Sequence, residues 1–83
     1  LNRLLEEAKA KHEPPMYQGR RLKLYYTAQI STAPPSFAII ANQPKGIHFS
    51  YQRYLTNRFR EGLGLDHVPL RLLFRERNRK EKG

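Results

Sequence analysis

The spacing of the apolar residues changes along this 83-residue chain, and each change limits which element of secondary structure can form there. Near the start, the apolar residues fall three or four positions apart, which is the pattern of an amphipathic helix. They are Leu1, Leu4, Leu5 and Ala8. We therefore expect a helix from Leu1 to about Lys11. Pro14 and Pro15 end it, because a residue before proline is kept out of the α region.

From Arg21 the period becomes two, which is typical of a strand with one buried and one wet face. The residues expected to face the core are Leu22, Leu24, Tyr26, Ala28 and Ile30. The residues expected to face water are Lys23, Tyr25, Thr27, Gln29 and Ser31. A second strand over residues 37–42 is apolar on both faces and is therefore expected to be central. The proline-containing loop 31–36 is short, which predicts an antiparallel hairpin.

Helical spacing returns after Ile47, and it predicts a second helix from about Tyr51 to Gly62 with Ser50 as its N-cap. Gly62 and Gly64 stand where a left-handed C-terminal cap is expected. A third strand is expected from Val68 to about Arg77. Its apolar side consists of Leu70, Leu72 and Phe74, and its other side of Arg71, Leu73, Arg75 and Arg77. The pattern is compatible with pairing of this strand with either the first or the second.

The order helix, strand, strand, helix, strand predicts an α+β fold with two layers, in which both helices cover one face of a three-stranded sheet. We expect one domain over residues 1–77. Residues 78–83 contain no apolar side chain and are expected to form a disordered basic tail, either simply solvated or an arm that contacts RNA. Since the chain opens in a helical pattern without a methionine, we expect it to be a fragment of a longer protein.

The charge of the chain points to a polyanionic partner. Sixteen Lys and Arg against seven Asp and Glu give a formal net charge of +9, and such a density on one small domain is typical of nucleic-acid binding. There is no cysteine, which excludes disulfides, cysteine zinc sites and thiol nucleophiles. No apolar run approaches the ~20 residues of a membrane-spanning helix. No membrane partner is expected.

Motifs of catalysis are absent from the sequence. It contains no GxxxxGK[ST] phosphate loop, GxGxxG, HExxH or GxSxG pattern. The three histidines, His12, His48 and His67, are far apart in the sequence and do not have the spacing of a metal site. The carboxylates show no pair in an apolar setting. We therefore expect no catalytic residue and no metal ligand in this chain.

The candidate binding residues are basic side chains together with one aromatic. Arginine binds phosphate through two parallel hydrogen bonds, and tyrosine can stack on an unpaired base. The candidates for RNA binding are Arg20, Arg21, Lys23, Tyr25, Arg53, Arg60, Arg71 and Arg75. If the first and third strands are neighbours, most of these side chains share one sheet face. For Tyr25, stacking on a base and plain strand propensity remain alternatives.

Four blocks of the sequence resemble a known family. They are residues 19–29 (GRRLKLYYTAQ), 34–37 (PPSF), 49–61 (FSYQRYLTNRFRE) and 68–75 (VPLRLLFR). In this order and spacing they resemble the C-terminal KH-like domain of the Der (EngA) family of bacterial GTPases. The resemblance implies a KH-like α-β-β-α-β fold at the end of a longer protein with two tandem GTPase domains.

The resemblance also implies a function. Members of the family act in assembly of the large ribosomal subunit and associate with its ribosomal RNA. GTP and magnesium would be bound by the GTPase domains, so this fragment would hold no cofactor and would not be an enzyme by itself. The expected partners are ribosomal RNA and the GTPase domains of the same chain. We expect a monomer in the cytoplasm.

One departure from ordinary KH domains limits what can be inferred. Those domains clamp nucleic acid with a GXXG loop between two helices, whereas this chain has no GXXG and only one helix between its second and third strands. The single-strand grip of a KH domain is therefore not expected. Two functions remain open, namely electrostatic docking on folded RNA, and packing on the GTPase domains as an interdomain regulator.

Overall fold

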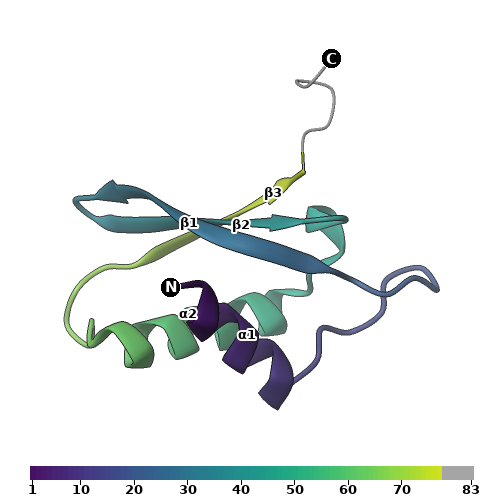
Figure 1. Ribbon diagram of the computed structural model, residues 1–83, viewed down its shortest axis with the longest axis horizontal. Helices are drawn as coiled ribbons and strands as arrows, with labels where there is room; N and C mark the ends of the chain where they lie inside the picture. Colours follow the sequence, from purple (N-terminus) through teal and green to yellow (C-terminus); the bar gives the residue numbers. More distant parts are fainter. Residues whose placement is uncertain (78–83) are drawn as a thin grey trace.

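The computed structural model describes residues 1–77, and it has the predicted order of elements. These elements are α1 (Asn2–Lys11), β1 (Leu24–Thr32), β2 (Pro35–Ala41), the 3-10 turn η1 (Pro44–Gly46), α2 (Phe49–Leu63) and β3 (Arg71–Glu76). Figure 1 shows both helices on the same face of the sheet, with the other face uncovered. The predicted two-layer α+β architecture is confirmed. The tail predicted for residues 78–83 lies outside the described residues.

The strands lie in the order β1-β2-β3, so β2 is central as predicted. β1 runs antiparallel to β2, and β3 runs parallel to it. The pairing of the third strand, which the sequence left open, is therefore with β2. Since β2 separates β1 from β3, the basic residues of these two strands do not lie on neighbouring strands.

The prediction of which side chains of β1 face the core is wrong beyond Tyr25, because a β-bulge lies at this residue. Leu24 pairs with Ala41 but Tyr26 pairs with Ile40, so one extra residue stands in β1 between these pairs. An extra residue reverses the alternation that follows it. Thr27, predicted to face water, is therefore buried toward the helices. Tyr26, predicted in the core, is 46% exposed. Ala28, likewise predicted in the core, is exposed, and so is Ile30, which stands at a second irregularity of β1 between Gln29 and Ser31.

The core lies between the sheet and the two helices. Phe59, Leu5, Ile39 and Leu55 are its largest fully buried side chains. Phe37 from the sheet meets Phe59 from α2 edge to face, with the ring centroids 5.8 Å apart. The Tyr51 hydroxyl donates to the His12 carbonyl at 2.6 Å and fastens α2 to the end of α1. Burial raises the pKa of this hydroxyl above its ordinary value of 10.0, and the nearby Tyr54 and Glu13 reinforce the shift.

Some element boundaries differ from those predicted. α2 begins at Phe49, because the Nδ1 atom of His48 accepts the Ser50 backbone N–H at 3.0 Å and makes His48 the N-cap in place of Ser50. β2 begins at Pro35, which is tolerated because a proline can occupy the first position of a strand. β3 begins only at Arg71. Gly64 ends α2 with φ of 67°, which confirms the expected left-handed cap.

Candidate nucleic-acid interface

The three strands bring basic residues together at one end of the sheet. β1 begins at this end, and both β2 and β3 finish there, because β1 is antiparallel and β3 parallel to β2. Asn42 follows β2 and fixes the segment before β1. Its Oδ1 accepts from the Lys23 N–H at 2.9 Å, and its Nδ2 donates to the Arg21 carbonyl at 3.2 Å. The Arg77 N–H donates to the Ala41 carbonyl at 3.3 Å and keeps the end of β3 in place. We call Arg21, Lys23, Arg75 and Arg77 the basic end.

Tyr25 lies beside this group, two residues after Lys23 and in contact with Arg77. The guanidinium carbon of Arg77 is 4.0 Å from the centroid of the Tyr25 ring, in a cation–π contact. Tyr25 is half-buried. Arg77 was not among the candidate residues, although the alternation of arginines along the third strand was a signal for it. The contact places an aromatic ring and an arginine side by side where phosphate and base could both be bound.

A tight turn presents Arg20 next to the basic end. Tyr17 and Arg20 exchange two backbone hydrogen bonds of 2.8 and 2.9 Å, with Gln18 and Gly19 at positive φ between them. Glycine adopts this conformation without steric cost. The Tyr17 side chain packs so tightly on Gly46 that a Cβ there would overlap it. The turn is therefore anchored to η1, and both Arg20 and Arg21 are exposed.

The charges of the basic end have few partners. Arg21 lies 4.0 Å from a carboxylate oxygen of Glu13, but both side chains are more than 70% exposed, and such surface pairs are weak. Within residues 1–77, neither Lys23 nor Arg75 nor Arg77 takes part in a salt bridge. The positive charge is therefore available for a ligand.

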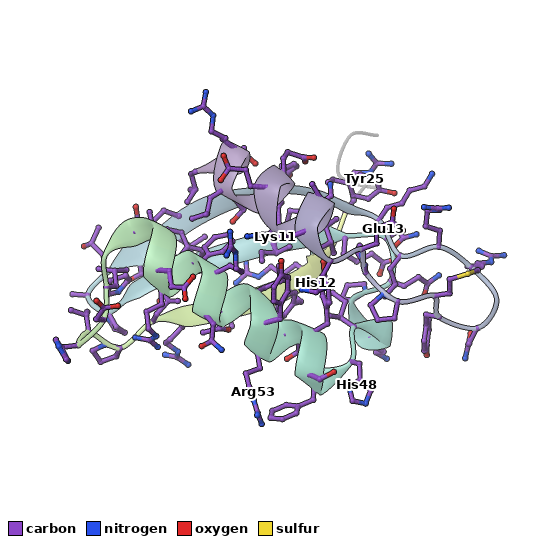
Figure 2. The ribbon with its side chains drawn as sticks, turned by 90° about the horizontal axis from the view of Figure 1, so that it is seen from below. Lys11, His12, Glu13, Tyr25, His48 and Arg53 are labelled. Carbon is purple, nitrogen blue, oxygen red and sulfur yellow. The ribbon has the colours of Figure 1, made fainter. Side chains whose placement is uncertain are left out.

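Three of the candidate residues lie elsewhere. Arg71 pairs with Ser36 at the far end of β3, four residues and about 13 Å from Arg75. Arg53 stacks on the exposed Phe49 ring at 4.7 Å, and Figure 2 shows it pointing away from the molecule on the side of α2 remote from Tyr25. The guanidinium of Arg60 donates to the carbonyls of Leu65 and Val68 at 2.9 and 2.7 Å, so it holds the connection between α2 and β3.

Other kinds of site were also sought in the described chain. Over residues 1–77, no three His, Cys, Asp or Glu side chains come together as metal ligands would. Neither helix of this part has the length and apolar character that crossing a bilayer requires.

Comparison with known proteins decides the family. Residues 1–75 match the family described as KH-domain-like of EngA bacterial GTPase enzymes, C-terminal. The chain belongs to this family. The EngA KH-like assignment agrees with the two-layer fold and with the resemblance seen in the sequence. The match is to the C-terminal, KH-like part of these enzymes, and their catalytic GTPase domains lie outside this chain.

Curated relatives support the EngA assignment over nearly the whole chain. The chain is 58% identical over 80 residues to a protein named GTPase Der from Syntrophobacter fumaroxidans, covering 95% of this chain. It is 53% identical over 81 residues to GTPase Der from Syntrophotalea carbinolica, covering 98%. It is 48% identical over all 83 residues to GTPase Der from Geotalea daltonii. The chain spans only 18–19% of the length of these relatives.

Proposed function

We propose that this domain docks a GTPase of the Der family on ribosomal RNA of the large subunit, through the basic end of its sheet. The observation that carries the proposal is that Arg21 and Lys23, which precede β1, lie at the same end of the sheet as Arg75 of β3 and Arg77, which follows β3. Four exposed cations at one end of the sheet offer several positive charges for phosphates, and arginine matches phosphate through two parallel hydrogen bonds.

The proposed mode is electrostatic docking on folded RNA. The hydrogen bonds of Asn42 hold the main chain of the basic segment before β1, so binding has to order only the side chains of Arg21 and Lys23 there. Phosphate contacts of this kind position a protein on RNA without reading its sequence. GTP and magnesium belong to the preceding GTPase domains. The domain contributes the RNA contact to a cytoplasmic, monomeric protein.

Charge reversal in the full-length protein tests this proposal. The double variant Arg21→Glu, Lys23→Glu is expected to bind ribosomal RNA more weakly. It should also show a smaller salt dependence, by about 0.7–0.9 in log K per log salt for each lost phosphate contact. The matched control is Arg3→Glu, Arg53→Glu, which makes the same change in net charge at exposed positions outside the basic end. An unchanged affinity of the first variant, or equal losses in both, would contradict the proposal.

The uncovered face of the sheet favours a second function, packing on the GTPase domains. It carries Tyr26, Ala28, Ile30, Ile40 and Leu73, of which Tyr26 and Ile30 are 46% and 43% exposed. A contiguous apolar face on a soluble domain is typical of a protein interface rather than of a phosphate-binding surface. Arg75 of the basic end lies on this face in one row with Ile40 and Tyr26, so the two proposed surfaces adjoin at Arg75.

A second pair of variants tests the packing function. Tyr26→Thr, Ile30→Thr keeps residues with good strand propensity and removes exposed apolar area. In the full-length protein it is expected to change the intrinsic rate of GTP hydrolysis and to increase cleavage between domains by protease. Gln29→Thr, an exposed polar position of the same strand, is the control. Unchanged hydrolysis and cleavage in the double variant would exclude this face as an interdomain contact.

A further inference from the structure

A groove of about 510 Å³ lies between the C-terminal half of α1 and the start of β1, next to the basic end. Its size is within the range of small-molecule sites. Ala10, Leu22 and Leu24 supply apolar lining, Arg21 and Lys23 supply cations, and Tyr25 supplies an aromatic ring. Figure 2 shows Tyr25 and Glu13 on the same side of the molecule, beyond the end of α1, and both residues line the groove.

Not every charge in the groove is available to a ligand. The Lys9 ammonium donates to Glu6 at 3.0 Å and to the Leu24 carbonyl at 2.7 Å, so it connects α1 to β1. Arg21 and Lys23 remain as cations for a bound anion. The Glu13 carboxylate remains as an acceptor, since its contact with Arg21 is 4.0 Å long and exposed.

We propose that this groove holds a single unpaired RNA nucleotide, with its phosphate on Arg21 and Lys23 and its base against Tyr25. The inference rests on the proposed RNA docking and assigns a site to it. A nucleotide offers the three features that the groove matches, namely an anion, a flat aromatic base and polar base edges. The guanidinium of Arg77 covers one face of the Tyr25 ring, so the base is proposed to contact the part of the ring that lines the groove.

The groove also predicts which base is bound. The Glu13 carboxylate can only accept hydrogen bonds, so it favours a base edge that presents N–H donors. Guanine presents an amino group next to a ring N–H and can match both carboxylate oxygens, whereas uracil has no amino group. We therefore expect an unpaired guanosine to bind more tightly than an unpaired uridine.

Two RNA hairpins test the inference with the full-length protein, one fully paired and one carrying a single bulged guanosine. Fluorescence anisotropy is expected to show about tenfold tighter binding of the bulged RNA, in the lower part of the range for stacking one base on an aromatic side chain. Ala10→Leu fills the groove from an exposed helical position and should remove this difference while leaving binding of the paired hairpin unchanged. Asn57→Leu, an exposed position on α2, is the control.

The outcomes separate this inference from the proposed function. Equal binding of the two hairpins by the unmodified protein would overturn the nucleotide site and leave RNA docking intact. Binding of neither hairpin would overturn both. Glu13→Gln provides a second readout at an exposed position, because it should reduce the preference for a bulged guanosine over a bulged uridine. An unchanged preference in Glu13→Gln would overturn the role of the carboxylate.

Discussion

The guanidinium of Arg77 contacts the ring of Tyr25 at 4.0 Å, although the two residues come from opposite edges of the sheet. The contact crosses the end of β2, where the Arg77 N–H donates to the Ala41 carbonyl. Tyr25 is the extra residue of the β-bulge, and bulges re-aim side chains at the ends of strands. The bulge at Tyr25 therefore brings the first strand into contact with the residue that follows the last strand, at the end of the sheet where the basic residues lie.

This contact predicts a coupling energy between the two residues. A double-mutant cycle with Tyr25→Leu and Arg77→Ala, measured by urea unfolding of the 83-residue chain, is expected to give about 0.5–1 kcal/mol, the range for exposed cation–π pairs. The same cycle with Tyr25 and Arg53, which stacks on Phe49 instead, is the control and should give a value near zero. A coupling indistinguishable from that control would show that the Arg77 contact does not persist in solution.

Gly46→Ala is expected to disturb the turn that presents Arg20. The new Cβ would overlap the Tyr17 side chain, including its Cβ at 2.8 Å, and the ring cannot escape by a small rotation. Overpacking of this kind costs about 1–3 kcal/mol of unfolding free energy. We also expect weaker RNA binding, since backbone hydrogen bonds join Tyr17 to Arg20, which directly precedes Arg21 of the basic end. Lys45→Ala in the same 3-10 turn is the control, and a Gly46→Ala variant as stable as that control would contradict the packing described.

Arg60→Ala is expected to affect stability rather than RNA binding. Two hydrogen bonds from its guanidinium reach the carbonyls of Leu65 and Val68, and hydrogen bonds from charged groups contribute about 1.5–3 kcal/mol. Partial exposure places the expected loss near the lower end of that range. Chemical denaturation measures it, with Arg53→Ala on the same helix as control. If RNA affinity fell with stability unchanged, Arg60 would instead belong to the binding surface.

Tyr51 predicts a loss of stability in alkaline solution. Because burial raises the pKa of its hydroxyl above 10.0, the unfolded chain releases this proton at a lower pH than the folded one. The contribution of the protonated Tyr51 hydroxyl to the free energy of unfolding is fully present below pH 10, and it decreases as the pH rises above that value. Tyr51→Phe should be less stable than the unmodified chain at neutral pH, because it lacks the hydrogen bond to His12. It should lose less stability than the unmodified chain when the pH is raised into the alkaline range.

Unfolding curves at several pH values measure this effect. Tyr26→Phe, which alters an exposed tyrosine, is the matched control. Parallel pH profiles for Tyr51→Phe and the unmodified chain would show that Tyr51 is not protected from ionisation in the folded state.

The sequence predicted the elements well because both amphipathic periods are clear in it. The stripe of α1 and the apolar run of β2 each identify one element without reference to the rest of the chain. The face of Tyr26 could not be predicted in this way. Hydrophobic alternation continues through residues 22–30, and only the pairing with β2 reveals the extra residue at Tyr25. The exposed apolar face that results has no signature in the sequence of β1 alone.

The candidate site was predictable in its chemistry and less so in its geometry. Arg21 and Lys23 were identified from charge, but their meeting with Arg75 depends on the parallel pairing of β3 with β2. That pairing joins residues that are far apart in the sequence, and the local pattern of apolar residues does not predict it. Arg60 was identified from charge as well, but its guanidinium holds a loop instead of lying at the basic end. Its two carbonyl acceptors are five and eight residues further along the chain, in a loop whose course the sequence does not specify.

The most direct test of the account is the salt dependence of ribosomal RNA binding by the full-length protein. It should be compared with the variant Arg21→Glu, Lys23→Glu and with the control Arg3→Glu, Arg53→Glu. The account predicts a steep loss of affinity with salt for the unmodified protein and the control. It predicts a weaker affinity and a slope reduced by about 0.7–0.9 per lost phosphate contact for the basic-end variant. Superimposable lines for all three proteins would contradict RNA docking through the basic end.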